Sequence, residues 1–266
     1  LAPDAARRQE ALEELPQMIG EFQKPRYFAY DPDICAHGAS GMTGCSNCLL
    51  ACATEAIVSV GDKVEVDPYL CQGCGSCATV CPTGAMQYQA PPVGDVLDGA
   101  RRMLRAFRER AGDEPAPEIL LYSADSAQPE LMEAAPALPE HLLPLPVEDV
   151  GSVGMDAWLS MLAFGAARVW MLPGPSPAAG KVEASRGMIR VVSRILEALG
   201  DPDHAERVTW LRHAGDVRDC GAVRPLVREP AGFAALGNKR EVIRRALKAL
   251  HAQAEAPREV MPLPAG

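Results

Sequence analysis

The stretch that decides the fold is Cys71-Gln72-Gly73-Cys74-Gly75-Ser76-Cys77-Ala78-Thr79-Val80-Cys81-Pro82. An earlier run has Cys35, then nine residues, then Cys45-Ser46-Asn47-Cys48-Leu49-Leu50-Ala51-Cys52. Residues 45–57 align with residues 74–86 without a gap, so the two runs form an internal repeat. Together they hold eight of the nine cysteines in 266 residues. The repeat predicts a duplicated half-fold built around thiolate ligands.

The close spacing of these cysteines favours an iron–sulfur cluster over zinc or disulfides. Residues 71–82 follow the C-x2-C-x2-C-x3-C-P spacing of bacterial iron–sulfur proteins. Zinc sites usually combine C-x2-C pairs across longer gaps, and disulfides are rare without a secretory context. Glycines let such loops turn tightly and bring backbone N–H groups near sulfur. The glycines in question are Gly41, Gly44, Gly73 and Gly75.

From Tyr27 to Gln89 the chain resembles the two-cluster bacterial ferredoxins. The resemblance implies two 4Fe-4S clusters, and in that family the fourth cysteine of each run ligates the other cluster. It therefore implies one cluster on Cys35, Cys45, Cys48 and Cys81, and a second on Cys71, Cys74, Cys77 and Cys52. The chain departs from the family pattern in two ways: Ala53 replaces the usual proline, and nine residues are inserted after Cys35.

Two other side chains could take part in the chemistry. His37 lies in the inserted loop, where it could replace a ligand or tune a cluster, but we favour the alternative of a loop histidine on the surface. Cys220 stands alone beside Asp219, and we interpret it as a structural or incidental thiol.

Composition limits the possible partners and location. A chain of 266 residues with 48% hydrophobic content allows one large or two medium domains. The net charge of −9 argues against nucleic acid as a partner. No apolar run is long enough for a membrane span. The start at Leu1 lacks the apolar segment of an export signal, so we expect a trimmed or internal start and a cytoplasmic location.

The cysteine-rich stretch is also acidic. Residues 27–90 carry six acidic side chains against one basic one, Lys63. The acidic residues are Asp31, Asp33, Glu55, Asp62, Glu65 and Asp67. Such a face could steer a basic redox protein toward the module. A merely solvated acidic surface is the alternative interpretation.

The overall pattern predicts an α+β ferredoxin-like dicluster module followed by a small three-layer α/β domain with a mostly parallel sheet. Leu12, Leu15 and Met18 follow helical spacing, so we expect a lead-in helix packed against another surface. The expected divisions are residues 1–24 for this helix, 25–91 for the dicluster module, 92–117 for a linker helix, 118–215 for the α/β domain, and 216–266 for a C-terminal helix and proline-rich tail. Asn238 and Glu241 form a capping-box pattern at the start of that helix.

Hydrophobic periodicity locates the expected elements. In the module we expect strands at Tyr27–Tyr30 and Val64–Val66, and a hairpin over 57–65 that turns at Gly61-Asp62. In the α/β domain we expect strands at Ile119–Ser123, Leu142–Pro146, Arg168–Leu172 and Val208–Leu211. The helices between them are expected at Pro129–Ala137, Met155–Phe164 and Lys181–Leu199. Strands and helices that alternate in this way predict right-handed β-α-β units.

The linker segment predicts an amphipathic helix over residues 95–110. Its apolar face has Val96, Ala100, Met103, Leu104 and Phe107. Its other face carries Arg101, Arg102, Arg105 and Arg108. We expect these arginines to be solvated, with packing on the acidic module or on a partner as the alternative.

Two further resemblances concern the rest of the chain. Residues 146–172, with Leu162-Ala163-Phe164-Gly165-Ala166-Ala167, resemble the delta (iron–sulfur) subunit of methanogen-type hydrogenases. Where that family has cluster cysteines this chain has Ser123, Val150 and Pro173, so the resemblance implies a docking or scaffold domain. Residues 237–244 and 263–266 resemble the middle of bacterial polyferredoxins encoded beside formate dehydrogenases, which implies further ferredoxin modules in a full-length chain.

The sequence does not favour a nucleotide site. Gly174 to Lys181 has the position of a phosphate loop, but five residues separate its glycines and Val182 replaces the hydroxyl that would bind magnesium. The residues after the first expected strand contain no G-x-G-x-x-G. A nucleotide-using oxidoreductase is therefore the weakest of three hypotheses.

The leading hypothesis is an electron carrier, not an enzyme with catalytic residues of its own. Two 4Fe-4S clusters would relay single electrons between a dehydrogenase, with formate dehydrogenase as a candidate, and an acceptor. The alternative is a cluster-containing assembly or redox-sensing protein that docks on a client oxidoreductase.

Overall fold

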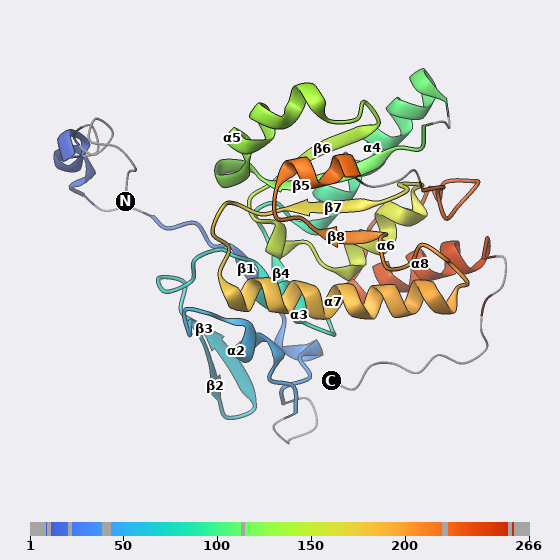
Figure 1. Cartoon of the computed structure of the whole chain (residues 1–266). Coiled ribbons are helices and arrows are strands. Elements are labelled where there is room, and N and C mark those ends of the chain that lie inside the picture. The colour runs from blue at the N-terminus through green and yellow to red at the C-terminus, as the bar shows by residue number, and fades with distance from the viewer. Residues whose placement is uncertain are drawn as a thin grey trace.

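Figure 1 shows the computed structural model, which describes residue 9 and residues 12–20, 23–38, 44–112, 115–219, 223–254 and 257. The cysteine-rich module and the α/β domain lie against each other, and the long helix α7 passes close to both (Figure 1). No helix in these described ranges is both long enough and apolar enough to cross a bilayer.

The module contains two small antiparallel sheets. Strand β1 (Phe28–Tyr30) pairs with β4 (Met86–Tyr88), so the two ends of the module meet. Strands β2 (Ile57–Val60) and β3 (Lys63–Val66) form a hairpin, as predicted, with Gly61 at positive φ in its turn. Short helices lie between these strands in the chain: η2 (Pro32–Ile34) and α2 (Asn47–Ala51) between β1 and β2, and α3 (Ser76–Val80) between β3 and β4.

The second part is an α/β domain with a four-stranded parallel sheet, which confirms the predicted parallel pairing. Its strands are β5 (Glu118–Ser123), β6 (Leu142–Val147), β7 (Val169–Leu172) and β8 (Val208–Trp210). The strand order is β6-β5-β7-β8. From β5 the chain first adds β6 on one side, and it then crosses to add β7 and β8 on the other side. Ligands of such sheets bind at the carboxyl ends of the strands near this switch point.

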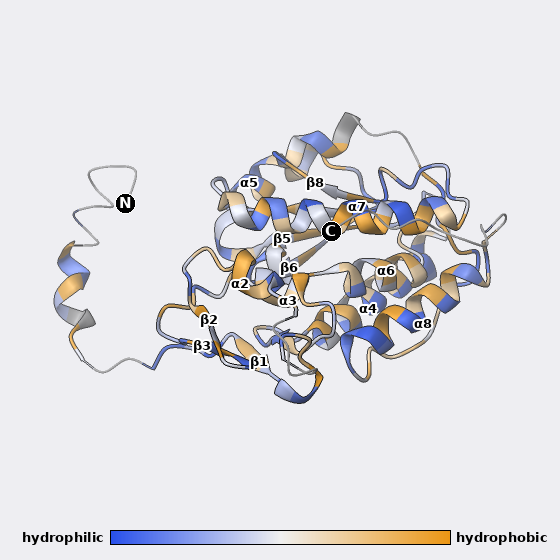
Figure 2. Cartoon of the chain, turned by 90° about the horizontal axis from the view of Figure 1, so that it is seen from below, coloured by the Kyte–Doolittle hydropathy of each residue, from blue (hydrophilic) through white to orange (hydrophobic). Residues whose placement is uncertain are grey.

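Alternating residues of β5 face two separate cores. Ile119 and Leu121 join a core with α4 (Val93–Ala111), α6 (Met155–Ala163), α7 (Ala179–Ala198) and α8 (Lys239–His251). Leu120 joins a smaller core with α5 (Ala124–Ala134) and η5 (Ala214–Asp219). Three layers result, because a strand presents successive side chains to opposite faces. Hydrophobic and hydrophilic colours alternate along α4 and α8, as expected for helices with one buried side (Figure 2).

Two of the expected helices differ in the structure. Helix α5 begins at Ala124 rather than at Pro129, and η3 (Ala135–Ala137) follows it. Pro129 lies inside the helix, although proline usually begins one, because it lacks the N–H that a helix interior uses. Near the N-terminus, η1 (Leu15–Met18) extends away from the body (Figure 1). Leu12 and Leu15 are 60% and 54% exposed, so the expected packing of this segment is wrong for its described residues.

The module and the α/β domain are joined by close contacts around α3. The Thr79 hydroxyl donates to the Gly151 carbonyl at 2.7 Å. The Lys239 ammonium, in the first turn of α8, donates to the carbonyls of Ala78 and Thr79 at 2.8 and 2.7 Å. Gly75 lies so close to Ser152 that a Cβ at position 75 would overlap that side chain.

Candidate metal centres

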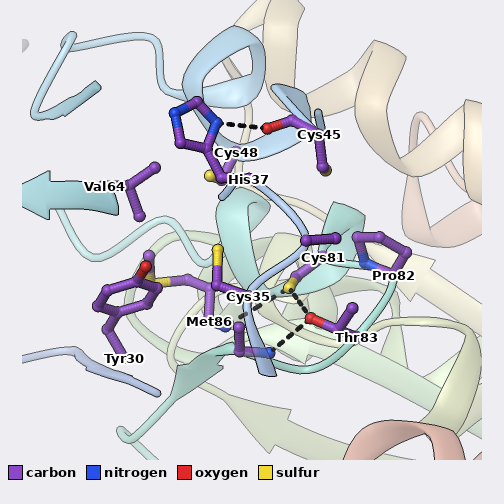
Figure 3. Close-up of a pocket in the computed structure, with 12 residues that line it drawn as sticks. Tyr30, Cys35, His37, Cys45, Cys48, Val64, Cys81, Pro82, Thr83 and Met86 are labelled. Atoms are coloured by element: carbon purple, nitrogen blue, oxygen red, sulfur yellow. Dashed lines mark hydrogen bonds between the residues drawn. The ribbon is translucent and has the colours of Figure 1, made fainter. Parts of the chain in front are cut away.

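The eight cysteines of the module line two separate cavities. The first is lined by Cys35, Cys45, Cys48 and Cys81, together with His37 and Met86 (Figure 3). The second is lined by Cys52, Cys71, Cys74 and Cys77. These are the two groups of four that the ferredoxin resemblance implies, while the ligation itself stays a prediction.

The short helices explain why each run divides between the cavities. Cys48 lies in α2 and Cys77 in α3, each with its side chain in the cavity of its own run. Cys52 and Cys81 are the residues that end these helices, and both have extended backbone angles. The chain therefore leaves the helix at the fourth cysteine, whose thiol lines the other cavity.

Burial and neighbouring thiols raise the pKa of one cysteine in each cavity. Burial, together with charge repulsion from Cys81, Cys45 and Cys35, raises the pKa of Cys48 to about 11. Burial likewise raises the pKa of Cys77, with Cys74 and Cys71 contributing. Four thiolates can share one cavity only when positive charge compensates them, as iron does in a cluster.

Cys81 differs because it receives hydrogen bonds. Burial alone would raise its pKa, but donation from the Met86 N–H at 3.4 Å and from the Thr83 hydroxyl at 3.6 Å lowers it overall. The Thr54 hydroxyl occupies the corresponding place in the other half of the repeat, 3.7 Å from the Cys52 sulfur. Hydrogen bonds of this kind stabilise negative charge on sulfur.

The expectation that His37 lies on the surface is wrong. The side chain is 1% exposed, and its Nδ1 lies 2.7 Å from the Cys45 carbonyl oxygen (Figure 3). Its Nε2 lies 2.8 Å from the Ser59 hydroxyl. Because a carbonyl only accepts, Nδ1 donates to the Cys45 oxygen, and Nε2 shares a second hydrogen bond with the Ser59 hydroxyl. Both nitrogens are therefore engaged, and His37 holds the backbone at Cys45 in place. The local sequence of the loop does not indicate that the β2–β3 hairpin covers His37.

Two of the glycines singled out from the sequence adopt the left-handed conformation. Gly73 and Gly75 have φ values of 68° and 72°. Gly73 also accepts a hydrogen bond from the Tyr88 hydroxyl at 2.8 Å, and the Tyr27 ring leaves no room for a Cβ there. Gly41 lies outside the described residues.

The α/β domain contributes part of the second cavity. Asp149 follows β6, Ala178 precedes α7, and Lys181 lies in the first turn of that helix. The Lys181 ammonium forms an ion pair with the Asp149 carboxylate, and both side chains are mostly buried. The carboxyl edge of the parallel sheet, where such folds bind ligands, therefore faces the cysteine module.

Sequence reasoning did not predict Asp149 or Lys181 at this site. The local pattern around Lys181 is typical only of an imperfect phosphate loop. A signal was present, because both residues follow expected strands and ligands bind at the carboxyl edge of a parallel sheet.

The positions where the hydrogenase-like frame has cysteines lie at the same sheet edge. Val150 N–H donates to the Ser123 hydroxyl at 3.2 Å. The sequence has no cysteine between Cys81 and Cys220, and Cys220 lies outside the described residues. The likeness of this domain to the hydrogenase subunit stays a prediction.

The donor set of the two cavities fits 4Fe-4S clusters. The eight cysteines of the described residues are free thiols, and each cavity presents the four that such a cluster takes. Within the described ranges no three His, Cys, Asp or Glu side chains are placed to hold a single metal ion. The second cavity encloses about 300 Å³. The first encloses about 20 Å³, so its fit depends on its thiols rather than on its volume.

Comparison with known proteins agrees with this chemistry. The family model of a 4Fe-4S binding domain matches residues 64–87. The chain is also 47% identical over 47 residues to indolepyruvate oxidoreductase subunit IorA of Pyrococcus horikoshii. That match covers 17% of this chain and 7% of the relative. No solved structure matches the chain. The chain thus contains a 4Fe-4S binding domain, which supports an iron–sulfur electron-transfer role.

Proposed function

We propose that this chain relays single electrons through two 4Fe-4S clusters. The observation that carries the proposal is the division of eight cysteines into two cavities of four. The clusters would supply the electron transfer, accepting and releasing one electron at a time. The protein supplies their ligands, excludes water and donates hydrogen bonds to sulfur.

Short helices place the two proposed clusters near each other. Cys48 lies in α2 and Cys52 directly follows that helix, only four residues along the chain, although the two line different cavities. Cys77 and Cys81 repeat this relation at α3. An electron on one cluster would therefore have a short path to the other.

The proposed partners are redox proteins. The relative is an oxidoreductase subunit, and the acidic side chains of residues 27–90 suit a basic docking surface. We propose a dehydrogenase, with formate dehydrogenase as a candidate, on one side of the relay and an acceptor on the other. A cytoplasmic location and further ferredoxin modules in a longer chain complete this proposal.

One observation favours the alternative of an assembly or redox-sensing protein. The α/β domain holds the module tightly and contributes Lys181 and Asp149 to the second cavity. Such a domain could grip a client oxidoreductase while the clusters act as a structural or sensing element.

Iron analysis and a redox titration test both proposals. Anaerobically purified chain is expected to hold about eight irons, and EPR of the reduced protein is expected to show two interacting spins. Zinc, or iron for a single cluster, would overturn the two-cluster proposal. Reversible one-electron reduction of both clusters supports the relay, whereas clusters that resist reduction by physiological donors favour the assembly role.

A further inference from the structure

A second kind of cavity lies on the α/β domain, beside the C-terminal half of α4. This end of α4 points away from the cysteine module (Figure 1). Its volume is about 580 Å³, which is within the range of small-molecule sites. Its walls come from α4, the end of α6 and the segment 230–232. Four arginines and one glutamate supply its charged groups: Arg101, Arg102, Arg105, Arg108 and Glu109. The cavity is therefore cationic on a chain whose net charge is −9.

The arginines form a row along one side of α4. Positions 101, 105 and 108 lie on the same helix face, and at 1.5 Å per residue they span about 10 Å. This spacing suits a ligand with two or more anionic groups. The expectation that these side chains are solvated holds for Arg102 and Arg105, which are exposed, but not for Arg101 and Arg108, which donate to backbone carbonyls of other segments.

Two of the guanidinium groups are held in place by hydrogen bonds to the protein. Arg101 donates to the Asp98 carboxylate at 2.9 Å and to the Gly232 carbonyl at 3.3 Å. Arg108 donates to the Gly165 carbonyl at 2.8 Å. Gly165 has no side chain, and a Cβ there would overlap the Arg108 guanidinium. The row therefore has fixed positions near its two ends.

The other two guanidinium groups are available to a ligand. Arg102 is exposed and has no hydrogen bond or ion pair within the described part of the chain. Arg105 pairs with Glu109 at 2.8 Å, but the arginine side chain is 79% exposed. Exposed pairs of this kind contribute little, so an anionic ligand could displace the glutamate.

We propose that this cavity binds a small polyanion that carries at least two phosphate or carboxylate groups. Guanidinium groups bind such groups with two parallel hydrogen bonds each, which a cluster of lysines would not do. The concave walls and the volume favour a small molecule over an acidic protein surface. The site is separate from the cysteine cavities, so it is independent of the proposed electron relay.

Isothermal titration calorimetry of the whole chain with inorganic pyrophosphate and with ATP tests the proposal. One saturable site is expected for at least one of these probes. The variant R102Q/R105Q is expected to weaken binding at least tenfold. The control variant R190Q/R194Q removes two arginines from the exposed face of α7, where each pairs with a glutamate, and is expected to bind as the unchanged chain does.

The charge-conserving variant R102K/R105K separates recognition from simple attraction. It is expected to bind more weakly than the unchanged chain, because lysine lacks the bidentate fork. Equal weakening by both glutamine variants, or heat from polyglutamate but from neither probe, would overturn the proposal. Thermal melting of every variant confirms that the chain is folded.

Discussion

The Lys181 ammonium forms an ion pair with Asp149 inside the cavity that Cys52, Cys71, Cys74 and Cys77 line. A positive charge beside a cluster favours its reduced, more negative form. We predict that Lys181→Met lowers the midpoint potential of the cluster proposed for this cavity by on the order of tens of millivolts. EPR-monitored redox titration measures the potential of each cluster.

Asp149, the ion-pair partner of Lys181, provides a test in which the potential is expected to shift in the opposite direction. Asp149→Asn keeps an oxygen that can accept from the Gly151 N–H, a bond of 2.8 Å in the structure, and removes only the charge. Its second-cluster potential is expected to rise. Equal shifts of both clusters, or shifts of the same sign in the two variants, would contradict a local effect of Lys181.

The crosswise division of cysteines predicts a specific pattern of non-additivity. Cys52→Ser and Cys74→Ser remove ligands of the same proposed cluster, so the double variant is expected to lose no more iron than either single one. Combining Cys52→Ser with Cys48→Ser is expected to disrupt both clusters. The measurement is the iron content of each anaerobically purified variant. Cys220→Ser, which lies outside both runs, is the control and is expected to retain about eight irons. If the first double variant loses twice the iron of the single ones, the grouping is wrong.

The contact between the two parts of the chain predicts an unusual cost at Gly75. Gly75→Ala introduces both a positive-φ strain and an overlap with Ser152. We expect the free energy of unfolding to fall by roughly 2–4 kcal/mol. Gly61→Ala is the matched control, because Gly61 has a similar φ of 64° but nothing within 4 Å of its Cβ position. Its loss is expected to be about 1 kcal/mol, and calorimetric melting compares the two; equal losses would argue against the overlap.

The buried histidine predicts a local effect on the first cavity. His37→Ala removes hydrogen bonds to the Cys45 carbonyl and the Ser59 hydroxyl. We expect a loss of about 2–3 kcal/mol in stability and faster bleaching of cluster absorbance in air. The exposed His251 is the control, since His251→Ala is expected to change neither quantity. A variant at position 37 that bleaches like the control would show that the histidine does not support this cavity.

The sequence predicted the elements whose pattern is local. The hairpin at residues 57–66 and the four parallel strands follow from periodicity within each segment, and the strand ends differ by only a residue or so. The cysteine spacing likewise indicated two runs, and the ferredoxin resemblance implied how their cysteines divide into two groups of four. Local pattern did not place the start of α5, because Pro129 also fits the beginning of a helix.

Features that depend on distant segments were not predictable in this way. His37 is buried only because the β2 strand folds over its loop. Lys181 reaches the second cavity because helix α7 packs against the module, more than a hundred residues away in sequence. The arginine-lined cavity needs Gly165 and the segment 230–232 beside α4. Such neighbours arise from tertiary packing rather than from the periodicity of any one helix.

The contacts of Gly75 with Ser152 and of Lys239 with the end of α3 have a consequence for how a relay would operate. A carrier domain on a flexible linker can move between donor and acceptor, but this module is packed tightly against the α/β domain. Under the proposed function the redox partners must therefore diffuse to the module. Donor and acceptor would dock in turn, or side by side, on the flank that the α/β domain leaves open.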